Sequence, residues 1–123
     1  DKAGTLSHDL KLMQDGARTL IFTDNPHTND SDSPPSFKSS QWQDMRSVIQ
    51  ELFDKQGITS MLVEGGAHLL AQFIDQGVYN EIFVQESDAY LQKGLSAPAL
   101  PLGLTLADQT KLGDTRISHW VRA

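Results

Sequence analysis

A carboxylate followed by two glycines stands near the middle of the chain, at Glu64-Gly65-Gly66, between an apolar run and an amphipathic segment. Glycine has no Cβ atom, so the backbone can turn sharply there and a ligand can approach the main chain. A helix that begins at about Ala67 points its free N–H groups toward this turn, and those groups together with the helix dipole favour a phosphate. The pattern therefore predicts an anion site suited to a nucleotide phosphate. Gly-Gly turns that bind nothing are also common, so the pattern alone leaves a purely structural turn open.

The elements on either side of this turn are predicted from the spacing of apolar residues. Residues 58–64 contain the unbroken run Met61-Leu62-Val63, which favours a central strand covered on both faces, as in a parallel sheet. Residues 67–77 carry apolar side chains at helical spacing and end at a glycine, which predicts a helix. The turn would then join a buried strand to a helix.

Upstream of the turn, a second strand is predicted over residues 18–24, which are rich in β-branched and aromatic side chains. Thr23 and Asp24 end this strand, and ligands of open parallel sheets bind at that edge. Thr and Asp are also common turn formers at strand ends, so both a binding role and a structural role stay open for them. Residues 41–56 have apolar side chains at steps of three and four, with Ser39 or Ser40 as the expected N-cap, and predict a helix that packs on the sheet.

The remaining segments complete an α/β fold. Residues 25–40 are polar and proline-rich, which indicates a loop, and the spacing of their His and Asp residues predicts no metal site. Residues 81–86 predict a third parallel strand, and residues 87–103 an irregular loop. Residues 105–111 and 115–122 predict an antiparallel hairpin around Gly113-Asp114. The expected sheet is thus mainly parallel and closes with a C-terminal antiparallel hairpin.

Composition limits the classes of function. The 123 residues suit one domain, and the net charge of -6 disfavours a broad surface for nucleic acid or anionic membranes. The chain has no cysteine, so it holds neither a disulfide nor a thiolate metal site, which fits a cytoplasmic protein. No apolar run approaches the length of a membrane span. Small-molecule or protein partners are therefore favoured over nucleic acid and membranes.

These motifs resemble the reductase domain of the bifunctional riboflavin-biosynthesis deaminase-reductase. The likeness is strongest over residues 58–86, where Val-Glu-Gly-Gly is followed by the apolar positions of the helix and the next strand, and it extends to residues 19–23, residues 94–98 and the closing hairpin. The resemblance implies a dihydrofolate reductase-like, three-layer α/β/α fold. It also implies an NADPH-dependent reduction of a phosphoribosylamino-pyrimidine to its ribityl product, in a homo-oligomer.

The resemblance assigns roles to individual positions. Glu64 matches an acidic residue that contacts the substrate, and no catalytic residue is assigned. The implied NADPH contacts lie along the turn and at two upstream positions; they are Gly65, Gly66, Ala67, His68, Leu69, Leu70, Thr23 and Lys2. The family does not require histidine at the position of His68, so a solvated side chain there is the alternative to a phosphate contact.

The chain also departs from the family pattern. Complete reductase domains of the family are longer, and the sequence before Asp1 would hold the opening strand and the side chains that bind the substrate phosphate and nicotinamide. A deaminase domain would need cysteine ligands for zinc, which this chain lacks. We therefore expect residues 1–123 to be the C-terminal portion of a reductase domain. The alternatives are a dihydrofolate reductase-like enzyme for another substrate and a non-catalytic nucleotide-binding or assembly module.

Overall fold

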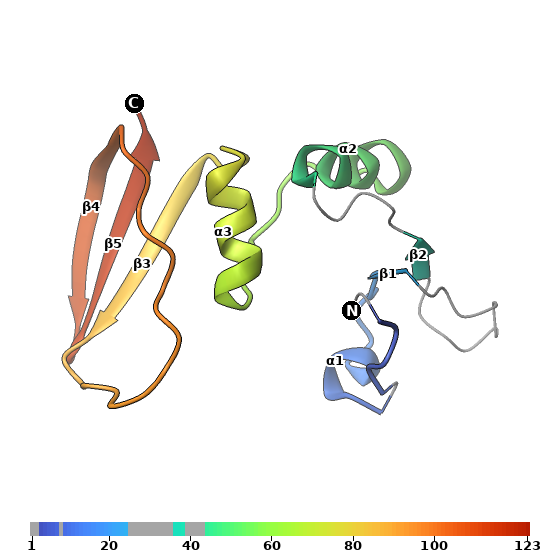
Figure 1. The fold of residues 1–123 in the computed structure, drawn as a ribbon, viewed down its shortest axis with the longest axis horizontal. Coiled ribbons are helices and arrows are strands. Elements are labelled where there is room, and N and C mark those ends of the chain that lie inside the picture. The colour runs from blue at the N-terminus through green and yellow to red at the C-terminus, as the bar shows by residue number, and fades with distance from the viewer. Residues whose placement is uncertain (1–2, 8, 25–35, 39–43) are drawn as a thin grey trace. The chain divides into compact units, whose positions relative to one another are not determined.

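The computed structural model describes residues 3–7, 9–24, 36–38 and 44–123, and the chain divides into two compact units, residues 1–42 and 43–123. Figure 1 shows the helices and strands along the chain. The first unit contains α1 (Lys11–Gln14), β1 (Ile21–Thr23) and β2 (Ser36–Lys38). β1 and β2 pair in parallel, with Ile21 opposite Ser36. The strand predicted over 18–24 is confirmed at its C-terminal half.

β2 corrects the prediction of an uninterrupted loop over residues 25–40, and it is the parallel neighbour of β1. The residues of a parallel pair need not be apolar, because their main-chain N–H and C=O groups form the ladder. The serine- and proline-rich composition of this segment therefore predicted a loop, although the segment contains a short strand.

The second unit contains two helices and three strands: α2 (Met45–Gln56), α3 (Ala67–Asp75), β3 (Glu81–Ser87), β4 (Leu104–Leu112) and β5 (Thr115–Arg122). Both predicted helices are confirmed within the described residues. The predicted start of the first helix at residues 41–43 and its expected caps, Ser39 and Ser40, lie outside the described residues. The buried hydrophobic side chains of this unit come from the two helices; they are Met45, Val48, Leu52 and Phe73. Phe53, which belongs to the same predicted stripe, is 53% exposed, and the packing of the first helix on the sheet stays a prediction.

Asp44 is the N-cap of α2, and its carboxylate accepts hydrogen bonds from the main-chain N–H groups of Arg46 (3.2 Å) and Ser47 (3.4 Å) and from the Ser47 hydroxyl. These bonds satisfy donors that the first turn of a helix leaves open. They favour the ionised carboxyl, so the side-chain and main-chain bonds from Ser47 hold the pKa of Asp44 below its ordinary value of 3.8.

We expect this cap to make thermal stability depend on pH in the acid range. Because the folded pKa of Asp44 is lowered, the cap contributes stability above the ordinary pKa, and the contribution is lost as pH falls through the folded pKa. Asp44→Asn keeps a capping oxygen that does not titrate. Circular dichroism melts at decreasing pH should show a steeper loss for the wild type than for Asp44→Asn, and equal slopes would contradict the assignment.

The three strands of the second unit form an antiparallel sheet in the order β3-β5-β4, with β5 between the other two (Figure 1). Phe83 on β3 lies opposite His119 on β5. The closing hairpin is therefore confirmed. The prediction of a mainly parallel sheet is wrong for the described residues. β5 runs antiparallel to both of its neighbours, β3 and β4, so every ladder of this sheet is antiparallel.

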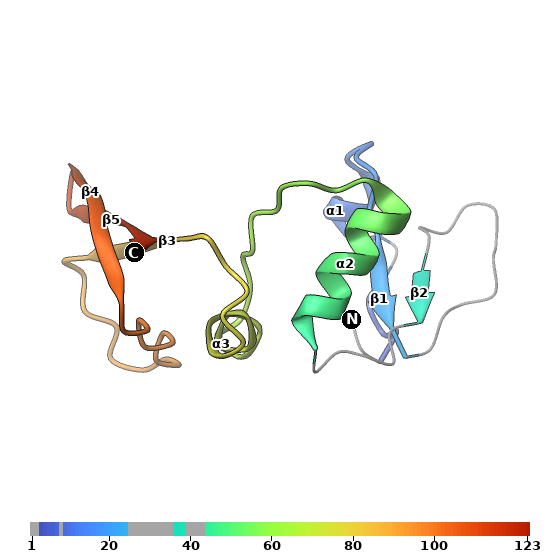
Figure 2. The same cartoon turned by 90° about the horizontal axis from the view of Figure 1, so that it is seen from above.

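The central strand predicted over residues 58–64 is also wrong. The chain between α2 and α3 follows an irregular path without helix or strand (Figure 2). Met61 is 44% exposed and Leu62 is 78% exposed, so the apolar run is not covered on both faces. An apolar run becomes a strand when a neighbouring strand supplies hydrogen-bond partners, and none of the described strands pairs with this segment.

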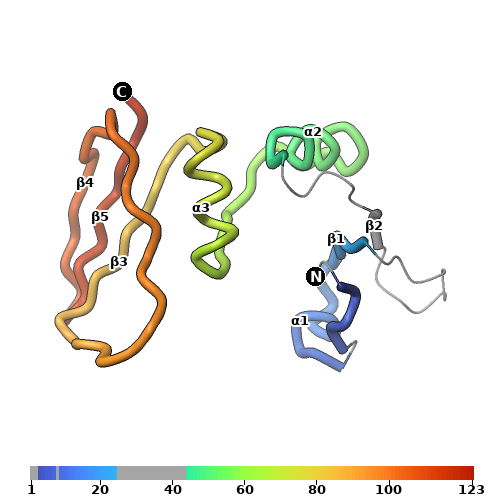
Figure 3. Tube along the Cα trace, in the orientation of Figure 1, coloured from blue at the N-terminus to red at the C-terminus, as the bar shows by residue number. Residues whose placement is uncertain are grey.

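The connection from β3 to β4, residues 88–103, contains no helix or strand, as predicted (Figure 3). Both strands run antiparallel to β5, so this segment must return along the length of the sheet before β4 can start. Its beginning is tied to the β4–β5 turn by the Asp88 N–H, which donates to the Asp114 carbonyl at 3.0 Å.

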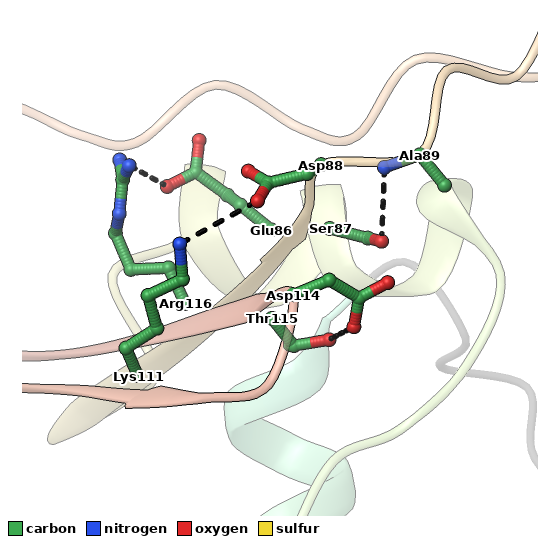
Figure 4. A network of polar contacts seen from close by, with 8 residues as sticks. All are labelled: Glu86, Ser87, Asp88, Ala89, Lys111, Asp114, Thr115 and Arg116. Atoms are coloured by element: carbon green, nitrogen blue, oxygen red, sulfur yellow. Dashed lines mark hydrogen bonds and ion pairs between the residues drawn. The ribbon is translucent and has the colours of Figure 1, made fainter.

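The exposed ion pairs Lys111–Asp88 (3.5 Å) and Arg116–Glu86 (3.9 Å) lie at the same end of the sheet (Figure 4). Exposed pairs of this kind add little stability.

The β4–β5 turn consists of Gly113 and Asp114, with Leu112 paired to Thr115. Gly113 has φ 60°, whereas no described residue other than glycine has a positive φ. A positive φ at the first of two turn residues is typical of a type II′ hairpin, for which glycine is the usual choice. The turn chemistry therefore explains why the sequence located the hairpin correctly.

We expect Gly113→Ala to lower the free energy of unfolding by about 1–2 kcal/mol, because an L-residue is strained at this φ. Gly94→Ala is the matched control, since an added Cβ finds open space at both glycines but Gly94 does not have a positive φ. Urea unfolding followed by circular dichroism measures both variants. A loss of stability that is equal in the two would show that the turn conformation is not its cause.

Candidate functional site

The predicted anion site lies at the start of α3, where Gly66 is the N-cap with φ -64° and ψ 157°. No side chain of the described residues caps this helix. The N–H groups of Leu69 and Leu70 donate to the Gly66 carbonyl at 3.0 and 3.3 Å, as the first turn of a helix requires. Donors earlier in the turn, on Ala67 and His68, precede the intrahelical ladder and point toward the N-terminal side. The helix start therefore offers main-chain donors to an anion.

The two glycines have different roles. A Cβ at Gly65 would lie 3.0 Å from Cδ2 of Leu69, so glycine at this position permits close packing against the helix. A Cβ at Gly66 would meet nothing within 4 Å, so this position is open to an approaching group. Neither glycine has a positive φ, so the turn does not depend on a left-handed backbone at either position. Gly66 is the position with room for a ligand beside the main chain.

Glu64 is exposed, and its carboxylate has no hydrogen bond or ion pair with the part of the chain that the structure describes. His68 is exposed as well, one position into the helix. Leu69 and Leu70 are half-buried, and apolar side chains cannot hydrogen-bond a phosphate, so any polar contact they make must come from the main chain. Residues 64–70 thus form an exposed turn, which begins with a carboxylate, and the first turn of α3.

The two upstream candidates come from the start of the chain. Thr23 is the last residue of β1, is 1% exposed and belongs to the first unit, whereas the turn belongs to the second. Its cofactor contact stays a prediction. Asp24 follows it and is half-buried. Lys2 lies outside the described residues.

The far end of α3 holds contacts that sequence patterns did not predict. Gln76, the C-cap, accepts a hydrogen bond through Oε1 from the Met45 N–H at 2.8 Å. Arg122 donates through Nη1 to the Gly77 carbonyl at 3.0 Å, and its guanidinium carbon lies 5.1 Å from the centroid of the Tyr79 ring. Periodicity and local motifs cannot reveal these contacts, because the partners are far apart in sequence. The helix dipole favours a basic residue near a helix C-terminus. As a sequence rule, however, it is applied to residues of the helix itself, and so it does not identify Arg122 on β5.

The described residues contain no group of three or more His, Cys, Asp or Glu side chains that could hold a metal ion. None of the described helices has the length and hydrophobicity that a bilayer crossing requires. What the turn offers is an open helix start without an acidic residue in its first turn, next to a glycine with free space. This donor set fits an anion such as a phosphate, and the exposed carboxylate of Glu64 can accept hydrogen bonds.

Comparison with known proteins agrees with the motifs. The sequence matches the RibD C-terminal domain family over residues 1–85. No curated protein matches it. The whole chain superposes on a diaminohydroxyphosphoribosylaminopyrimidine deaminase/5-amino-6-(5-phosphoribosylamino)uracil reductase from Thermotoga maritima (TM-score 0.78, 20% identity) and on Acinetobacter baumannii RibD (0.80, 16%), and it covers 36% of each of those chains.

The riboflavin biosynthesis reductase Rib7 of Saccharomyces cerevisiae is similar over the whole chain as well, with a TM-score of 0.74 and 15% identity, and 67% of it is covered. At these identities the superpositions establish a shared fold. The chain spans about a third of the length of the first two structures. The sequence match includes the Glu64-Gly65-Gly66 turn, all of α3 and most of β3. This chain therefore belongs to the RibD C-terminal domain family.

Proposed function

We propose that this chain serves the NADPH-dependent reduction of 5-amino-6-(5-phosphoribosylamino)uracil to its ribitylamino product in riboflavin biosynthesis, as part of a longer protein. The single observation that carries the proposal is the family match over residues 1–85, which contains the uncapped helix start at Gly66. The similar Thermotoga maritima protein is named for this reductase activity.

The roles of the residues follow from their chemistry. The reduction adds a hydride from NADPH and a proton from water to the substrate. The main chain of residues 65–70 receives the cofactor phosphates at the helix start. Glu64 accepts hydrogen bonds from N–H groups of the pyrimidine ring, as its exposed carboxylate permits. Thr23 and Lys2 are proposed as further cofactor contacts.

We also propose that the complete protein has the dihydrofolate reductase-like three-layer α/β/α fold and works as a cytoplasmic homo-oligomer. Apolar side chains along residues 88–103 support association, since Tyr90 is 97% exposed, Leu95 92% and Leu102 100%. Sedimentation velocity at increasing concentrations tests it, and a monomer at every concentration would contradict it.

Residues 1–123 by themselves should bind NADPH weakly and give no useful turnover. Hydride transfer needs the donor and acceptor carbons held about 3–3.5 Å apart, and such positioning supplies about 7–11 kcal/mol of the rate enhancement. Glu64 is exposed, and no described side chain hydrogen-bonds to its carboxylate. These open surroundings support the expectation that residues 1–123 do not position a substrate for hydride transfer.

Isothermal titration with NADPH and with the phosphoribosylaminouracil substrate tests the proposal, together with an NADPH-oxidation assay. Glu64→Gln should weaken substrate binding about tenfold, because it removes a charged acceptor, and should leave NADPH binding within about twofold. Glu86→Gln is the matched control, since Glu86 is exposed on β3 and forms a loose ion pair with Arg116 at 3.9 Å. In the complete protein, NADPH binding without substrate binding would favour a nucleotide-binding module or a reductase of another substrate, and binding of neither would contradict the proposal.

A further inference from the structure

The C-terminal end of α3 is closed by a Schellman motif. The Val78 N–H donates to the Phe73 carbonyl at 2.9 Å, and the Gly77 N–H donates to the Ile74 carbonyl at 3.0 Å. Gly77 has φ 62°, the left-handed conformation that this motif requires. The motif satisfies carbonyls of the last turn but leaves the Gly77 carbonyl pointing out of the helix, where another element can bind it.

Arg122, the last residue of β5, occupies that position. Its Nη1 donates to the Gly77 carbonyl at 3.0 Å, and the guanidinium lies over the Tyr79 ring at 5.1 Å. A Cβ at Gly77 would lie 3.5 Å from Nη2 of Arg122, so the guanidinium is in contact with the backbone of the turn. A planar guanidinium suits this double contact, because it donates in its plane and stacks on its face. Its charge is also favourable beside a helix C-terminus.

The same end of α3 is held from a second side. Gln76 Oε1 accepts a hydrogen bond from the Met45 N–H at the start of α2, at 2.8 Å. Within α3, Phe73 is the buried residue and most of its neighbours are half-buried, so packing holds one face of this short helix. The polar contacts at its C-terminal end hold it at further points and so help to set its direction.

We propose that Arg122 is a positioning residue for the cofactor-binding turn, acting through α3, an inference that rests on the function proposed above. A helix is stiff, so an anchor on its last turn also sets the direction in which the Ala67 and His68 N–H groups point. Loss of the anchor lets α3 sample other orientations. The apparent affinity for the phosphate then falls with the fraction of molecules in which the helix start is correctly placed.

Arg122→Met tests this role, because it keeps the length of the side chain and removes its charge and donors. We expect the dissociation constant of NADPH, measured by titration of the full chain, to rise about three- to tenfold, which is the range of one ordinary hydrogen bond lost at an exposed site. Arg122→Lys should restore part of the loss. Arg116→Met is the matched control on the same strand, and it should change the constant less than about twofold, since exposed ion pairs contribute little.

Amide hydrogen exchange of α3 shows whether the effect passes through the helix. Exchange at Gln76, Gly77 and Val78 should become faster in Arg122→Met by a factor similar to the loss of affinity, and remain unchanged in Arg116→Met. If Arg122→Met does not fold, Tyr79→Leu replaces it, because this variant removes the ring under the guanidinium and leaves the hydrogen bond.

The outcomes separate this inference from the proposed function. A wild-type chain that does not bind NADPH contradicts the proposed function and, with it, the role of Arg122. If the wild type and Arg122→Met bind NADPH equally tightly, the proposed role of Arg122 is overturned, whereas the proposed function is not affected. Weaker binding with unchanged exchange in α3 also overturns it, since the helix is then not the route of the effect.

Discussion

Replacing Gly66 with aspartate should weaken NADPH binding at least tenfold without loss of the fold. The backbone at Gly66, with φ -64° and ψ 157°, suits any residue, and an added Cβ meets nothing within 4 Å. Aspartate is moreover a preferred N-cap, so α3 should become slightly more stable. The new carboxylate would stand where a phosphate binds. Two unit charges 4 Å apart repel by about 1 kcal/mol in water and about 4 kcal/mol near a protein surface, and about 1.4 kcal/mol corresponds to tenfold in affinity.

Gly66→Asn is the matched control, because it also caps the helix but carries no charge. The difference between the two variants in the dissociation constant of NADPH isolates the electrostatic part of the effect, and added salt should reduce it. Thermal melts of both variants report on the helix. If Gly66→Asp binds NADPH as the wild type does, the phosphate does not lie at this helix start.

Phe73→Ala should lower the free energy of unfolding by about 3–5 kcal/mol, the usual cost of removing a buried phenylalanine. Phe73 is 7% exposed and is the buried side chain of α3. Since small domains are stable by about 5–15 kcal/mol in total, this change removes a large share of the stability. Urea unfolding followed by circular dichroism measures it.

Phe53→Ala is the matched control, since it removes the same side chain from a helix at a position that is 53% exposed. We expect it to cost less than about 1 kcal/mol, because little apolar surface is returned to water. Phe73→Leu should cost less than Phe73→Ala, since part of the cavity stays filled. Equal losses for Phe73→Ala and Phe53→Ala would show that burial of Phe73 does not stabilise the second unit.

Local signals in the sequence predicted the helices and the hairpin. The apolar spacing of residues 41–56 and 67–77 identified α2 and α3, and Gly113 located the β4–β5 turn, because each of these features is set by residues within a few positions. Strand pairing is not local. The run Met61-Leu62-Val63 has the composition of a buried strand, yet it lies outside both sheets, because a strand also needs a neighbour to pair with.

The candidate site also has local features, which the sequence predicted, and non-local contacts, which it did not. The sequence by itself determined the family and the turn, since Glu64-Gly65-Gly66 and the start of α3 are contiguous, and their chemistry follows from residue type and from the geometry of a helix terminus. Tertiary structure alone decided what holds α3 in place. Arg122 meets the Gly77 carbonyl across 45 positions and Gln76 meets the Met45 N–H across 31. Such contacts depend on how the strands and helices fold back on one another, and the period of apolar residues along one element carries no information about them.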